Sequence, residues 1–181
     1  LTERKHRYYR RLFLEPIVYH HEIPEDEADY LKHFYGAVEN NVNRYTDYRF
    51  ERYKHNSLLV RQAYSLGDVC HPSESMDAKL ALMAGHYMLN KPGEFPLQFY
   101  NEIELTVDKI DYMLDDLREM YRKYWTQKLR KSSLTEIRTR FLTYLLAWNF
   151  AAPIDERTYL IKEGLFRVVG DYMEDAQGVE T

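Results

Sequence analysis

One unbroken ladder of apolar side chains constrains this sequence more than any other feature. Between positions 100 and 124, large apolar or aromatic residues recur at steps of alternately three and four. That spacing places all of them on one side of an α-helix, and no Gly or Pro interrupts residues 97–131. The pattern predicts a long central helix over 97–131 within an all-helical bundle. The ladder consists of Tyr100, Ile103, Val107, Ile110, Leu114, Leu117, Tyr121 and Tyr124.

Local start and stop signals predict the remaining helices of a bundle with five to six helices. Pro24 precedes three acidic residues, which suits the positive end of a helix dipole. Ser133 and Glu136 have the spacing of a capping box, and Gly67 is a helix stop. With the apolar periodicity, these signals predict helices over 1–13, from 25 to between 40 and 66, over 74–90, over 133–152 and from 155 onwards.

The length of the chain and its apolar content favour a single folded domain. The chain has 181 residues, of which 45% are hydrophobic, and it holds 7 Gly and 6 Pro. This length usually makes one domain, although two small ones are compatible with it. We therefore expect one helical domain over 1–181, in which 1–22 can form a peripheral arm and 176–181 a frayed tail.

Charge, cysteine content and hydropathy bound the setting in which the protein works. The formal net charge is −4 and Cys70 is the single cysteine, so we expect no internal disulfide and an intracellular, reducing compartment such as cytoplasm or nucleus. The longest apolar run, 80–89, is too short to cross a bilayer. The N-terminal residues also lack the apolar stretch of a signal peptide, so we expect no membrane partner.

Motifs for catalysis, metals and cofactors are not found in the sequence. A di-iron bundle needs two Glu-x-x-His pairs, whereas the chain has one, Glu3 with His6. The neighbouring His20 and His21 point different ways on regular structure. No two glycines lie within three residues of each other, which excludes the common phosphate-binding loops and the nucleophile elbow. We therefore predict no catalytic residue, no metal site and no cofactor.

Aromatic residues beside arginine suggest that the protein binds other proteins. The chain contains 17 tyrosines, and large aromatic side chains with nearby arginine are typical of interface hot spots. The hypothesis we favour is a non-enzymatic interaction or scaffold domain, a subunit or adaptor of a larger assembly of unknown partners and stoichiometry. The candidate partner-binding residues are Arg118, Tyr121, Arg122, Tyr124 and Trp125.

Basic and aromatic residues also interleave in a way that keeps nucleic acid as an alternative partner. Arginine and lysine bind phosphates, and tyrosine stacks on unpaired bases. The negative charge of the whole chain makes this hypothesis second to protein binding. A helical enzyme or small-ligand binder is the remaining alternative, and it requires a buried pocket with converging polar groups. The candidate nucleic-acid-binding residues are Arg44, Tyr45, Tyr48, Arg49, Arg52, Tyr53, Lys128, Arg130 and Lys131.

Overall fold

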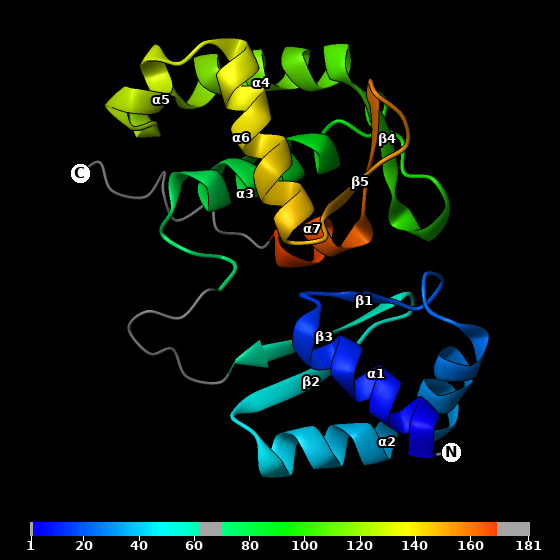
Figure 1. Cartoon of the computed structure of the whole chain (residues 1–181). Coiled ribbons are helices and arrows are strands. Elements are labelled where there is room, and N and C mark those ends of the chain that lie inside the picture. The colour runs from blue at the N-terminus through cyan, green and yellow to red at the C-terminus, as the bar shows by residue number, and fades with distance from the viewer. Residues whose placement is uncertain (1, 62–69, 170–181) are drawn as a thin grey trace. The chain divides into compact units, whose positions relative to one another are not determined.

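The chain separates into two compact units where the sequence predicted one domain. The computed structural model describes residues 2–61 and 70–169 (Figure 1). Unit 1 comprises residues 1–69 and unit 2 comprises residues 70–181. The predicted stop at Gly67 and the predicted tail at 176–181 lie outside the described residues.

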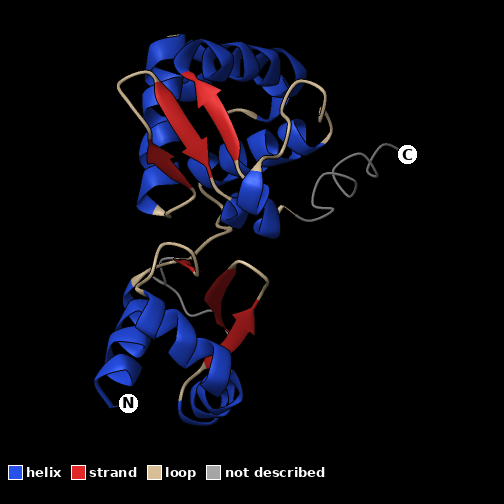
Figure 2. Ribbon diagram, turned by 90° about the vertical axis from the view of Figure 1, so that its right-hand side faces the viewer, coloured by secondary structure: helices blue, strands red, loops and turns tan. Residues whose placement is uncertain are grey.

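The prediction of an all-helical fold is wrong, because each unit contains a three-stranded antiparallel sheet. The sheets are small, and the helices of unit 2 flank its strands (Figure 2). Strand β4, Ile103–Thr106, shows why the pattern misled. Its side chains alternate between buried Ile103 and Leu105 and exposed Glu104 and Thr106. Ile103 also fits the helical ladder, and a strand of four residues is too short to distinguish the period of a strand from that of a helix.

Unit 1 is built from two helices and three strands. Its elements are α1 (Thr2–Leu14), β1 (Val18–Tyr19), α2 (Glu25–Tyr45), β2 (Tyr48–Arg52) and β3 (Asn56–Arg61). The start of α2 after Pro24 confirms the predicted signal, with three acidic residues in its first turn. The helix ends at Tyr45, where Thr46 turns to an extended conformation. A β2–β3 hairpin follows, in which Phe50 faces Leu59.

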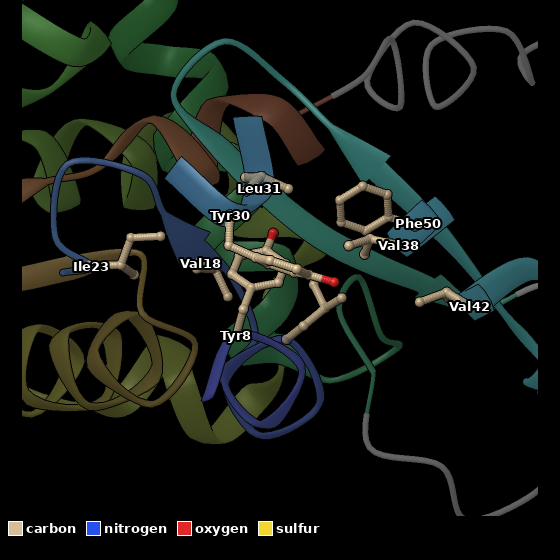
Figure 3. Close-up of a cluster of buried hydrophobic side chains, with 9 residues drawn as sticks. Tyr8, Val18, Ile23, Tyr30, Leu31, Val38, Val42 and Phe50 are labelled. Carbon is tan, nitrogen blue, oxygen red and sulfur yellow. The ribbon is translucent and has the colours of Figure 1, made fainter. Parts of the chain in front are cut away.

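The core of unit 1 draws on both helices and the sheet (Figure 3). Tyr8 and Leu12 of α1 are buried, so α1 belongs to this core and is not a peripheral arm. Above the core, Glu27 is 1% exposed and accepts hydrogen bonds from Nε of Arg7 at 2.9 Å and Nε of Arg11 at 2.8 Å. These bonds satisfy a buried carboxylate and tie α1 to α2.

Unit 2 breaks the predicted 97–131 helix into several elements. Its elements are α3 (Met76–Leu89), η1 (Phe99–Asn101), β4, α4 (Val107–Tyr121), η2 (Arg122–Tyr124), α5 (Gln127–Lys131), α6 (Leu134–Ala147), β5 (Ala151–Pro153), β6 (Thr158–Ile161) and α7 (Glu163–Val168). Thr106 caps α4 by accepting from the backbone N–H of Lys109. Helix α4 ends at Tyr121, and Trp125 is extended. The predicted ladder is therefore helical and buried only from Ile110 to Leu117.

The C-terminal helix predictions also need correction. Helix α6 ends at Ala147 instead of 152, and the residues that follow form the β5–β6 hairpin. Asp155 does not begin a helix: its carboxylate accepts from the backbone N–H of Arg157 at 2.7 Å and shapes the hairpin turn. The pairing of β4 with β6 joins Ile103 to Ile161, far along the chain, so no local pattern signals it.

The two units share one plan. In each, a helix is followed by a strand, then by helical structure, then by a hairpin, and the first strand pairs with the third. In unit 1 the middle helix α2 is kinked at Phe34, whereas unit 2 has α4 and α6 in that place. In unit 2 this order is the two helices α4 and α6 followed by the β5–β6 hairpin. Segments η2 and α5 form the turn between these two helices.

Candidate interaction surface of unit 2

Helix α6 is held rigidly by its cap, its buried side and two ion pairs. The backbone N–H of Ser133 donates to Oε2 of Glu136 at 2.7 Å, completing the predicted capping box. Arg140 donates to Oδ1 of Asp77 at 2.8 Å, and Arg138 pairs with Asp111. The last two contacts use both arginines of α6 to join it to α3 and α4. The buried side of α6 consists of Ile137, Phe141, Leu142 and Leu145.

The opposite side of α6 is exposed and uncharged over most of its length. We call Thr135, Thr139, Thr143, Leu146 and Ala147 the α6 stripe; all five are exposed. Steps of three, four and seven or eight residues keep them on one side of the helix. The acid beside the stripe, Glu136, is engaged in the capping box. Sequence reasoning missed this surface, because threonine and leucine at helical spacing look the same whether they face a core or a partner.

Segment η2–α5 is anchored by two buried side chains and exposes its cations. Trp125 is 2% exposed and Leu129 is 0% exposed. Thr126 caps α5 by accepting from the backbone N–H of Leu129. All five cations of this segment are exposed. Lys123 lies over the ring of Tyr124, and among the described residues none of the other four has an ion pair. We call this set the α5 patch: Arg122, Lys128, Arg130 and Lys131.

Two open hollows flank α5. One, of about 400 Å³, is lined by Gln127 and three cations of the α5 patch: Arg122, Arg130 and Lys131. The other, of about 520 Å³, is lined by Met76, Thr126, Lys128, Ser132, Thr135, Glu136, Thr139 and Arg140. The first hollow has no acidic lining residue, and hydroxyl groups dominate the second. Both hollows open to solvent, unlike the enclosed pocket that small-molecule chemistry favours.

The structure distributes the predicted partner-binding residues over different environments. Tyr124 is 45% exposed, and Nζ of Lys123 lies 4.9 Å from its ring centroid. Tyr121 is half-buried, 6.5 Å from Tyr124 between ring centroids. Trp125 belongs to the core, so a partner cannot reach it in this conformation. The other two candidates, Arg118 and Arg122, differ in pairing: Arg118 pairs with Asp115, and Arg122 joins the α5 patch.

The predicted nucleic-acid residues fall into both units. Lys128, Arg130 and Lys131 lie together in the α5 patch of unit 2. The other six are in unit 1, from the end of α2 to just beyond β2. All six contact neighbours in the same unit. Arg44 lies over the ring of Tyr45, Tyr48 lies under Arg61, Arg52 lies over Tyr35, Arg49 pairs with Glu51, and the hydroxyl of Tyr53 donates to Glu51.

An aromatic cluster around His71 closes the C-terminal end of α6. The His71 ring lies 4.8 Å from Phe150 and 5.5 Å from Trp148 between centroids, and its Nδ1 is 2.6 Å from the hydroxyl of Tyr144. Burial lowers the pKa of His71 to about 4 and raises the pKa of Tyr144 to about 12, since both charged forms lose hydration. His71 and Tyr144 are 73 residues apart, so no local motif reveals them.

Fold and surface together define a class of protein, and the sequence defines its family. Unit 2 is a mixed α/β domain with a three-stranded antiparallel sheet, an uncharged helix surface and a cationic turn between α4 and α6. The family model "Protein of unknown function (DUF2398)" matches residues 2–164, and the chain belongs to that family. No curated protein matches the sequence. Among the described residues, no helix is long and apolar enough to cross a membrane.

Proposed function

We propose that this chain is a non-enzymatic subunit or adaptor that binds another protein through the α6 stripe. One observation carries the proposal: the exposed side of α6 shows three threonines, a leucine and an alanine and no unpaired charge. In a chain with 30% charged residues, this stripe lacks the charged side chains that a solvated helix face typically carries. The core of a protein interface is depleted in charge in the same way.

The rigidity of α6 supports this proposal. A helix that is capped, packed on one side and ion-paired to both α3 and α4 loses little freedom on binding. The cost of ordering the surface is therefore already met in the free protein. Leu146, which is 42% exposed, supplies an apolar contact, and the half-buried Trp148 follows two residues later in the chain. Large aromatic side chains at the edge of such a stripe are typical binding hot spots.

The single cysteine supports a reducing cellular compartment for the proposed adaptor. Cys70 is a free thiol whose Sγ lies 3.6 Å from the carbonyl of Pro72. A lone thiol persists in a reducing compartment, and we place the proposed adaptor there.

The proposal is tested by placing a charge in the middle of the stripe. Thr143→Glu should reduce capture of a specific protein from the native lysate at least tenfold, since an interface would bury the new carboxylate. Met120→Glu is the matched control: it adds the same charge at a site on α4 that is 51% exposed. Both variants should melt like the wild type.

Two results would reject the proposal. One is equal capture of the same proteins by wild type, Thr143→Glu and Met120→Glu. The other is loss of capture in both variants to the same degree, which would assign the effect to net charge rather than to the stripe.

A further inference from the structure

The turn of unit 2 concentrates positive charge that the unit itself does not neutralise. Between Glu119 and Glu136 the sequence holds five bases and no acid. Elsewhere in unit 2, arginines have partners: Arg118 with Asp115, Arg138 with Asp111, Arg140 with Asp77 and Arg157 with Asp108. Among the described residues, no such partner meets the four cations of the α5 patch. The lack of acidic partners in the described part of the unit indicates that these cations bind an anionic partner from outside it.

The arrangement of these cations fits phosphates better than a single carboxylate. Residues Arg122, Arg130 and Lys131 line one hollow beside α5, and Lys128 lines the other with the hydroxyl-bearing Thr126 and Ser132. Cations and hydroxyl groups together are the side chains that contact a sugar-phosphate backbone. Their spread over both flanks of one short helix matches an extended polyanion.

We propose that the α5 patch binds the phosphate backbone of double-stranded DNA without reading its sequence. Phosphate contacts of this kind hold a protein on a duplex, while free arginine, lysine, asparagine or glutamine side chains on an adjacent helix read the bases. Helix α6 carries no asparagine, glutamine or lysine, and both of its arginines are ion-paired. The patch therefore provides attachment, and the α6 stripe beside it stays available to a protein.

The proposal predicts a specific dependence on salt. If four cations each contact a phosphate, raising salt from about 50 to 200 mM should weaken binding roughly 100-fold. We would measure anisotropy of a labelled 20-base-pair duplex, and of a second duplex of scrambled sequence, with the full chain. The two duplexes should bind equally, because no base is read.

A double variant locates the contact. Arg130→Gln with Lys131→Gln should leave about a tenfold loss over the same salt range, since two contacts remain. Lys5→Gln with Arg10→Gln is the control, because it removes the same charge from two exposed positions on α1 of unit 1. The control should retain the wild-type salt dependence, and both variants should melt like the wild type.

Four results would overturn the assignment. Three of them are no binding of either duplex by the wild type at about 50 mM salt, an unchanged salt dependence in the patch variant, and an equal loss in the control. A patch variant that binds DNA normally but loses a protein from the lysate would assign the patch to an acidic protein and so also overturn it. The first three results do not bear on the α6 stripe, which the Thr143→Glu variant tests separately.

Discussion

Single buried positions on α4 decide whether unit 2 folds. Ile110 is 0% exposed, whereas Tyr112 on the same helix is 49% exposed. We expect Ile110→Asp to destabilise unit 2 by about 4 kcal/mol, because it buries an unpaired charge. Tyr112→Asp adds the same charge at the surface and should change little. Thermal melting of the two variants measures the difference; equal melting would mean that this side of α4 is not in the core.

His71 should make the stability of unit 2 depend on pH. Its pKa is lowered from 6.5 to about 4 by burial, so between these values the unfolded chain binds more protons than the folded one. Stability is therefore full above about pH 6.5 and falls as the pH drops towards 4. His71→Gln should flatten this part of the profile of melting temperature against pH. His33→Gln, at an exposed position, should leave the profile as it is in the wild type.

At the scale of elements, two neighbouring aromatic residues should behave in opposite ways. Trp125 anchors η2–α5 in the core, and Tyr124 faces solvent. Trp125→Ala should cost about 3–5 kcal/mol through the cavity it leaves, and Tyr124→Ala should leave melting nearly unchanged. Chemical denaturation of both variants tests this. An equal loss of stability in both variants would mean that Tyr124 also belongs to the core, which would contradict a surface role for the turn.

Local signals in the sequence predicted the helices that local physics controls. The start of α2 after Pro24, helix α3 and the capping box of α6 were all predictable, because each depends on residues within a few positions. The strands were not. They are two to six residues long, and β4 pairs with β6 across most of unit 2. Ile103 fits the helical spacing of the ladder, so the alternation of buried and exposed residues in β4 was not recognised. Pairing with β6 decides that these residues form a strand.

The same limit applies to the candidate site. Lys128, Arg130 and Lys131 stand out in the sequence, since a run of cations is visible without a fold. Whether an arginine is paired is not visible: Arg138 and Arg140 resemble the others until Asp111 and Asp77 come beside them. The α6 stripe has no charge to draw attention, and only burial on the opposite side of the helix shows that it faces outward.

At the scale of the whole molecule, the chain holds two separate cores. Unit 1 has its own cluster around Val38, and unit 2 is built around Ile110 and its neighbours. Units with their own cores unfold as separate cooperative transitions. We expect calorimetry to show two transitions, with Val38→Asp removing one and Ile110→Asp removing the other. A single transition that both substitutions shift equally would mean that the two cores fold as one.

Both surfaces that we propose to bind partners lie in unit 2. The shared plan of the two units makes the added segment in unit 2, η2–α5, the clearest structural difference between their middle regions. That segment carries the α5 patch, and α6, directly after it, carries the stripe. One unit thus presents two chemically distinct surfaces, which we propose bind an anion and a protein respectively.

The most direct test of the proposed adaptor role is site-specific photo-crosslinking in the native cell. A photoreactive residue in place of Thr143, in the middle of the stripe, should crosslink to one discrete protein. The same residue in place of Met120, which is also exposed but lies on α4, should not crosslink to that protein. The same weak, diffuse products from both positions would contradict the assignment of the α6 stripe as the protein-binding surface.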